Sequence, residues 1–257
     1  MQETKKVRLH LIDEYRGFVV LNMIVYHAIW DLVYIYGVDM QWYKSDMTFI
    51  WQQWGCWSFI LVSGFCWQMS KKPLKRGLMV FGGGLLVSLV TILVMPSSRV
   101  MFGVLTFLGS AMILMMPIDL VCKKINALLG AIGSFLLFAF TYSINRGYFG
   151  FFKIEILELP DAWYANLFTT YLGMSEPGFF STDYFSLFPW LFLYICGYFC
   201  YNLVFKSGAK SETKTVPTIM QKSVCPPLGW IGRKSFIIYL LHQPVTYAVL
   251  MLWDFLK

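Results

Sequence analysis

Long apolar stretches recur along the chain, and short polar or basic segments separate them. Each stretch has about 20 residues, the length that a helix needs to cross the hydrocarbon of a bilayer. Because a helix satisfies its own backbone hydrogen bonds in lipid, the pattern predicts an all-α fold, a polytopic transmembrane bundle forming one domain over residues 1–257. The predicted spans, about seven in number, cover roughly 17–37, 47–69, 77–95, 100–121, 127–144, 186–205 and 232–253.

The composition supports a membrane protein and excludes an ordinary soluble domain. Of the 257 residues, 58% are hydrophobic and 14% are charged, a balance that soluble domains of this size rarely show. The net charge of +7 does not indicate nucleic-acid binding, because the positions of the cations follow the predicted topology.

Lysine and arginine gather on one side of the predicted membrane. With the N-terminus in the cytoplasm, the inner segments hold 16 of the 21 Lys and Arg residues, and the outer segments hold five. This bias predicts N-in and C-out, with 206–231 inside and 145–185 outside, in a multi-pass protein of the plasma or inner membrane. The inner cations are Lys5, Lys6, Arg8, Arg16, Lys71, Lys72, Lys75, Arg76, Lys123, Lys124, Lys206, Lys210, Lys214, Lys222, Arg233 and Lys234; the outer ones are Lys44, Arg99, Arg146, Lys153 and Lys257.

The first predicted span, "RGFVVLNMIVYHAIWDL", carries several polar side chains. Arg16 and His27 are separated by about three helical turns, so they share a face, and Asp31 lies one turn further on that face. Arg16 could meet an anion at the cytoplasmic boundary. Asp31 could accept an imidazole N–H from His27, whose other nitrogen would then act as base or nucleophile. The alternative is a buried polar cluster that locks the packing, but ionisable residues inside membranes usually mark sites or pathways. Asn22 falls on another face, where we expect it to bond a neighbouring helix.

The last predicted span has a matching feature in "GRKSFIIYLLHQPV". His242 lies on one helical face with Ser235 and Tyr239, and it follows a basic inner end. Two of the three histidines in the chain thus occupy similar depths, in the first and last spans. This predicts one polar chamber that both helices line. For His242, the sequence does not distinguish a structural hydrogen-bonding role from a catalytic role.

These stretches, together with "YFSLFPWLFLYICGY", resemble a known family over most of the chain. It is the family named for the heparan-alpha-glucosaminide N-acetyltransferase catalytic domain, in its small bacterial members. The Arg and His pattern and "VSGF" also resemble membrane acyltransferase family 3. The resemblance implies transfer of an acetyl group from cytoplasmic acetyl-CoA to a sugar amine or hydroxyl at the outer side, and the family's Arg and His positions match Arg16 and His27. Lysosomal relatives have been argued to use a histidine in an outer loop. None is present in the outer loops here, so a histidine mechanism must use His27 or His242.

The residues fit the implied activity at both sides of the membrane. Cations at the inner side suit the phosphates of CoA. Acids and aromatics in the outer segment suit a sugar hydroxyl or amine. The candidate donor-binding residues are Arg16, Lys75, Arg76, Arg233 and Lys234, and the candidate acceptor-binding residues are Asp161, Trp163 and Asp183.

We therefore expect an integral membrane acyltransferase with His27, Asp31 and His242 as its catalytic residues. Its expected partners are acyl-CoA, a glycan or glycolipid acceptor and the lipid bilayer, with no metal and no nucleic acid, and homo-oligomerisation is left open. The main alternative is a proton-coupled transporter or flippase in which Arg16, His27 and Asp31 relay protons. A second alternative is a partner-binding subunit without chemistry.

Overall fold

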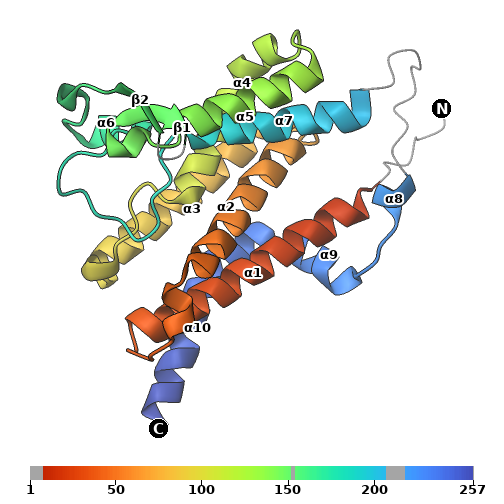
Figure 1. The fold of residues 1–257 in the computed structure, drawn as a ribbon. Helices are drawn as coiled ribbons and strands as arrows, with labels where there is room; N and C mark the ends of the chain where they lie inside the picture. Colours follow the sequence, from red (N-terminus) through yellow and green to blue (C-terminus); the bar gives the residue numbers. More distant parts are fainter. Residues whose placement is uncertain (1–7, 152–153, 207–217, 257) are drawn as a thin grey trace. The chain divides into compact units, whose positions relative to one another are not determined.

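The computed structural model describes residues 8–151, 154–206 and 218–256, which fold mainly into helices (Figure 1). The elements in chain order are α1 (His10–Tyr34), η1 (Gln41–Lys44), α2 (Asp46–Trp67), α3 (Pro73–Val94), η2 (Pro96–Ser98), α4 (Val104–Cys122), α5 (Ala127–Thr141), η3 (Ile144–Arg146), β1 (Tyr148–Phe151), β2 (Ile154–Glu158), η4 (Asp161–Trp163), α6 (Leu167–Leu172), α7 (Trp190–Lys206), α8 (Thr218–Gln221), α9 (Pro226–Arg233) and α10 (Ser235–Phe255). Six of the cations in the topology count lie outside the described residues, namely Lys5, Lys6, Lys153, Lys210, Lys214 and Lys257.

Every predicted span overlaps a helix, and within the described residues five helical segments are long and apolar enough to cross a membrane. These five are His10–Tyr34, Pro73–Val94, Val104–Cys122, Ala127–Arg146 and Ser235–Phe255. The apolar helix Trp190–Phe205 is shorter. A membrane protein of mainly helical fold is thus confirmed, whereas the count of about seven spans and the orientation of the termini stay predictions.

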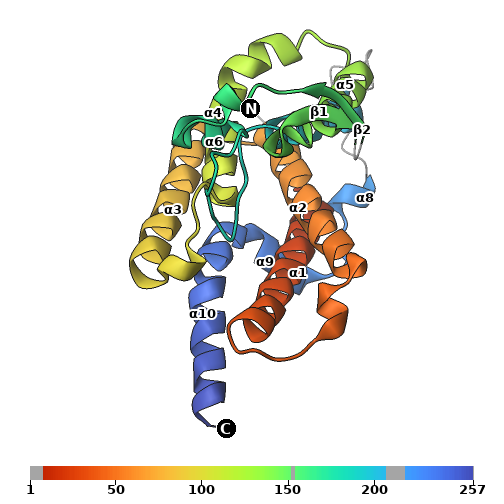
Figure 2. The same ribbon diagram turned by 60° about the vertical axis from the view of Figure 1, so that its left-hand side comes forward.

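The segment 145–185 differs from the all-α expectation. β1 and β2 form a two-stranded antiparallel sheet that pairs Tyr148 with Glu158 and Phe151 with Ile154. Figures 1 and 2 both show this hairpin beside α5. The strand signal was missed because aromatic and aliphatic residues here resemble the membrane stretches around them.

Local capping residues fix where several helices begin. The side chain of Asn126 accepts hydrogen bonds from Leu128 N and Leu129 N at the start of α5. Asn166 forms a capping box with Thr169 at the start of α6. These side chains satisfy backbone N–H groups that have no partner within the helix.

The chain divides into two compact units. The first comprises residues 1–62 and 210–257, and the second comprises residues 63–209. The division falls within α2, so the two halves of this helix belong to different units. The expectation of one domain stays a prediction.

In the first unit, α9 packs directly on the backbone of α1. A Cβ built on Gly17 would lie 1.9 Å from Leu228 O, and one built on Gly232 would lie 1.8 Å from Asp13 O. Only glycine permits such an approach. Because α10 begins directly after α9, this contact also determines where α10 starts relative to α1.

In the second unit, α3 packs on α4 and α5 packs on α7. The "GGG" stretch at 82–84 contributes to the first contact, since a Cβ on Gly84 would lie 2.5 Å from Thr106 N. Small residues let membrane helices approach closely, which suits helices that gain little from the hydrophobic effect in lipid.

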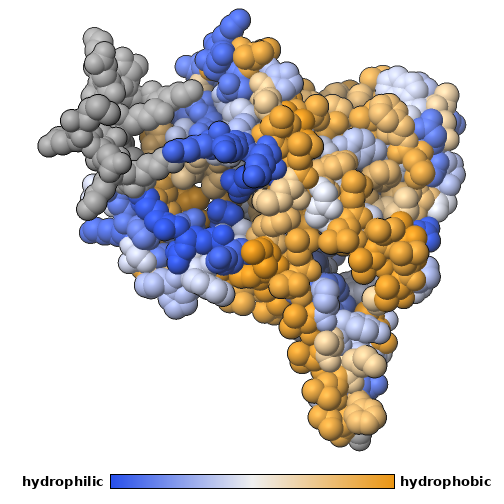
Figure 3. Space-filling model, turned by 180° about the vertical axis from the view of Figure 1, so that it is seen from behind, coloured by the Kyte–Doolittle hydropathy of each residue, from blue (hydrophilic) through white to orange (hydrophobic). Residues whose placement is uncertain are grey.

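Large apolar side chains remain exposed along the spanning helices. Leu85, Leu89 and Leu93 of α3 are 53%, 56% and 72% exposed, and Val249 and Leu252 of α10 are 60% and 59% exposed. Figure 3 shows broad areas of apolar side chains on one face of the molecule. Exposed apolar surface of this extent would be a liability in water but is expected of helices that face lipid.

Candidate functional site

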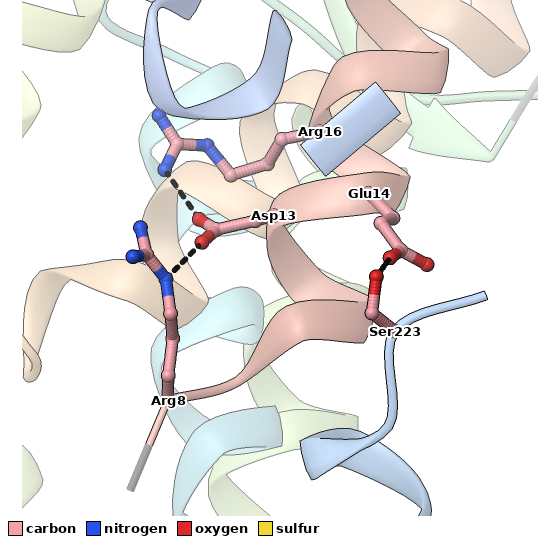
Figure 4. A network of polar contacts seen from close by, with 5 residues as sticks. All are labelled: Arg8, Asp13, Glu14, Arg16 and Ser223. Carbon is pink, nitrogen blue, oxygen red and sulfur yellow. Dashed lines mark hydrogen bonds and ion pairs between the residues drawn. The ribbon is translucent and has the colours of Figure 1, made fainter. Parts of the chain in front are cut away.

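The N-terminal end of α1 carries a cluster of opposite charges (Figure 4). The Asp13 carboxylate lies between two guanidinium groups, 3.1 Å from Arg8 Nε and 3.9 Å from Arg16 Nη1. Arg16 Nη2 also donates a hydrogen bond to Ser235 Oγ of α10, at 2.6 Å. Two cations share one carboxylate, so the cluster retains a net positive charge next to the start of α10.

His27 of α1 and His242 of α10 are hydrogen-bonded to each other. His27 Nδ1 lies 2.7 Å from His242 Nε2. His242 Nδ1 lies 2.5 Å from the backbone oxygen of Tyr239. His242 is buried and His27 is half-buried, so the pair lies between the helices with one ring more open than the other. The predicted meeting of the two histidines is therefore present within the first unit.

Asp31 is fully buried, and its carboxylate faces α10. Gln243 Nε2 donates to both of its oxygens, at 3.0 and 3.3 Å. The expected hydrogen bond from His27 to Asp31 is not among those of the described residues, because His27 bonds His242 instead. Gln243 was missed by the sequence analysis, although its position directly after His242 was a usable signal. Asn22 also differs from expectation, since its side chain bonds Phe18 O of its own helix.

Aromatic residues surround the histidine pair. Tyr239 stacks on Phe59 of α2, with ring centroids 5.9 Å apart and an interplanar angle of 14°. Tyr43, between α1 and α2, donates from its hydroxyl to Tyr26 O at 3.1 Å. Burial raises the pKa of Tyr43 above its ordinary value, so its phenol stays neutral and acts as a donor. The first half of α2 thus forms a second wall beside α1 and α10.

Glu14, near the N-terminal end of α1 that carries Asp13 and Arg16, forms another contact that the sequence did not predict. It is buried, and its carboxylate accepts from Ser223 Oγ at 2.5 Å and from Val224 N at 3.0 Å. Figure 4 shows Glu14 turned away from Asp13 and toward Ser223. This contact attaches the segment before α9 to α1. Nothing in the sequence pattern distinguished Glu14 from a solvated acid.

Comparison with known proteins places the chain in a family. The family model described as heparan-alpha-glucosaminide N-acetyltransferase, catalytic, matches residues 8–244. The chain belongs to this heparan-alpha-glucosaminide N-acetyltransferase family. No curated protein and no solved structure gives a match.

Family membership identifies a membrane acetyltransferase, and members of the family in general use acetyl-CoA as donor. The transporter interpretation is not favoured. The matched residues include α1 and the part of α10 that carries His242.

Two of the acetyltransferase's other candidate donor residues directly precede Ser235, the residue of α10 that Arg16 contacts. Arg233 ends α9 and Lys234 precedes α10, directly before the Ser235 that Arg16 contacts. Lys75 and Arg76 lie in the first turn of α3 and belong to the second unit. Arg16, Arg233 and Lys234 therefore all belong to the first unit, whereas Lys75 and Arg76 belong to the second.

The acetyltransferase's candidate acceptor residues all belong to the second unit. Asp161 and Trp163 lie in η4, and both are exposed. Asp183 has a structural contact, because its Oδ2 accepts from Val104 N at 3.0 Å at the start of α4. Among residues 8–151, 154–206 and 218–256, no group of three or more His, Cys, Asp or Glu could hold a metal ion.

Proposed function

We propose that this membrane acetyltransferase moves an acetyl group from cytoplasmic acetyl-CoA to a sugar amine or hydroxyl, in a glycan or glycolipid, at the outer side of the plasma or inner membrane. The observation that carries the proposal is the alignment of Arg16, His27 and Asp31 on one face of α1 against Ser235, His242 and Gln243 of α10. With the predicted topology, this row would run from the inner boundary, where Arg16 lies, toward the middle of the membrane, where His27 and Asp31 lie.

The donor binds at the end of α1 that carries Arg16. Arg8 and Arg16 share the carboxylate of Asp13. Arg233 and Lys234 add two more cations between α9 and α10. The cations at this end thus outnumber the carboxylates of Asp13 and Glu14, which leaves a positive charge that a phosphate or a carbonyl of CoA can use. Lys75 and Arg76 are proposed as further contacts to the donor. The inside bias of Lys and Arg supports the cytoplasmic placement of this end.

His27 performs the proton transfer as general base. An oxygen or nitrogen of the acceptor attacks the thioester carbonyl while its proton passes to His27, so a C–O or C–N bond forms and the C–S bond breaks. His27 then returns the proton to the CoA thiolate. In the alternative form, His27 attacks the thioester itself and carries the acetyl group to the acceptor in a second step.

Asp31 and His242 assist His27, while Asp161, Trp163 and Asp183 bind the acceptor. A buried carboxylate one turn from His27 stabilises the positive charge that develops on its imidazole. Exposed acidic and aromatic side chains of the kind found in η4 suit hydrogen bonding to, and stacking on, a sugar ring.

The test is transfer of labelled acetyl groups from acetyl-CoA to a soluble amino sugar by the purified protein in lipid nanodiscs. We expect His27→Ala to lower the rate by at least about a hundredfold, the usual contribution of a general base. His10→Ala is the matched control, because His10 begins α1 and lies outside the polar row. Its rate should equal that of the unaltered protein.

Transfer at the unaltered rate by His27→Ala would overturn the assignment of His27. Failure of the unaltered protein to bind acetyl-CoA saturably would overturn the acyltransferase itself and favour the alternative without chemistry.

A further inference from the structure

The hydrogen bonds around the two histidines have a defined direction. We propose that His242 is a positioning residue, which holds His27 in the tautomer with its proton on Nδ1 and its lone pair on Nε2. This inference rests on the proposed function only in taking His27 as the base; the tautomer itself follows from the geometry.

The direction of these hydrogen bonds follows from the backbone oxygen of Tyr239 in α10. A carbonyl oxygen only accepts hydrogen bonds, and its two lone pairs allow the Tyr239 oxygen to accept from a side chain as well as from its helix. His242 Nδ1 lies 2.5 Å from this oxygen, so Nδ1 must carry the proton. In a neutral imidazole the other nitrogen, Nε2, is then an acceptor.

The same logic fixes His27. The 2.7 Å separation between His27 Nδ1 and His242 Nε2 requires one proton between the two nitrogens. Since His242 Nε2 accepts, His27 Nδ1 donates, and the lone pair of neutral His27 lies on Nε2. The opposite direction would need a doubly protonated His242. His242 is 8% exposed, and that cation would have no ion-pair partner among the described residues, a costly arrangement.

Neighbouring contacts hold both rings in place. Gln243 binds Asp31 directly beside the histidine pair, so two consecutive residues of α10 attach to two residues of α1 that lie one turn apart. Tyr239, whose backbone oxygen accepts the hydrogen bond from His242 Nδ1, is itself stacked on Phe59. When His27 gains a proton during catalysis, its bond to His242 becomes charge-assisted and stronger, so the arrangement favours the transition state over the ground state.

The first test reads the tautomer without any activity measurement. The chain has three histidines, so protein labelled with ¹⁵N-histidine gives few imidazole signals, and His10→Gln and His27→Gln assign them. We expect His27 to show a protonated Nδ1 and an unprotonated Nε2 at neutral pH. A protonated Nε2 on His27 would overturn the proposal.

The second test separates positioning from packing. His242→Gln keeps an oxygen near the position of Nε2 that can accept from His27, whereas His242→Leu keeps the volume without an acceptor. We expect His242→Leu to lower kcat by about ten- to a hundredfold with KM nearly unchanged, and to leave His27 as a mixture of tautomers. His242→Gln should restore most of kcat and the single tautomer.

Equal loss of kcat in both variants, with the tautomer of His27 unchanged, would overturn the positioning role. If the unaltered protein shows the expected tautomer but transfers no acetyl group, the proposed function is wrong, whereas the positioning of His27 by His242 is confirmed. If His242→Leu does not fold, the unaltered protein and His242→Gln still decide the question.

Discussion

Arg16 makes contacts that support two different roles, one in binding and one in packing. It donates to Ser235 of α10 and pairs with Asp13 of its own helix, so its removal affects both helices. The Asp13 carboxylate would keep a partner in Arg8, which limits the structural cost. A role in donor binding therefore predicts a larger effect on affinity than on stability.

We predict that Arg16→Ala lowers the affinity for acetyl-CoA by about ten- to a hundredfold, the loss of a charge-assisted contact worth ~1.5–3 kcal/mol. Arg16→Lys should recover only part of it, because lysine lacks the planar fork. Binding isotherms and thermal unfolding of both variants are the measurement, with Ser235→Ala as control for the link to α10. Unchanged affinity with reduced stability would make Arg16 a packing residue.

A second residue prediction concerns Asp31. Asp31→Asn keeps an acceptor for Gln243 Nε2 but removes the charge, so we expect a folded protein with a rate at least about tenfold lower. Gln243→Glu would instead place two carboxyl groups in contact and should lower thermal stability. A rate for Asp31→Asn equal to that of the unaltered protein would assign Asp31 to packing alone.

At the scale of elements, the contact between α1 and α9 positions the polar row. Gly17 and Gly232 allow backbone contact, and Glu14 attaches the preceding segment through Ser223 and Val224. Because α10 follows α9 directly, a shift of α9 would also move the residues that His27 and Asp31 contact.

We predict that Gly17→Ala destabilises the protein by at least about 1–3 kcal/mol, since its Cβ would overlap the backbone oxygen of Leu228. Gly55→Ala in α2 is the matched control, because a Cβ there meets nothing within 4 Å and alanine favours a helix. Unfolding by heat or denaturant measures both. Equal stability of the two variants would show that α9 can move away from α1 without cost.

At the scale of the whole molecule, the proposed reaction requires the two ends of the polar row to face different compartments. The charge bias predicts that the segment after α7 lies in the cytoplasm and that the hairpin segment lies outside. Each compartment can be probed by an exposed residue, Lys222 for the inner segment and Ala165 for the outer one.

We predict that Lys222→Cys and Ala165→Cys, each in a background without the six native cysteines, react with a membrane-impermeant maleimide from opposite sides. Intact cells should label Ala165→Cys, and inverted vesicles should label Lys222→Cys. Labelling of both from one side would contradict the topology, and transfer across the membrane with it.

Properties within one helix followed from the sequence alone. The shared face of Arg16, His27 and Asp31 depends only on the regular rotation of an α-helix, and the helical positions of the spans depend on the length of each apolar stretch. The family also followed from the sequence, since short motifs in the right order were sufficient to recognise it.

The tertiary structure decided which side chains meet. His27 and His242 lie 215 positions apart, and similar depth in two helices did not show that Nδ1 of one would face Nε2 of the other. For the same reason, the sequence predicted a hydrogen bond from His27 to Asp31, whereas the structure shows one from Gln243 to Asp31. Periodicity fixes the face on which a residue lies, but the rotation of two helices about their axes depends on how their surfaces pack, and here that depends on glycine contacts between α1 and α9.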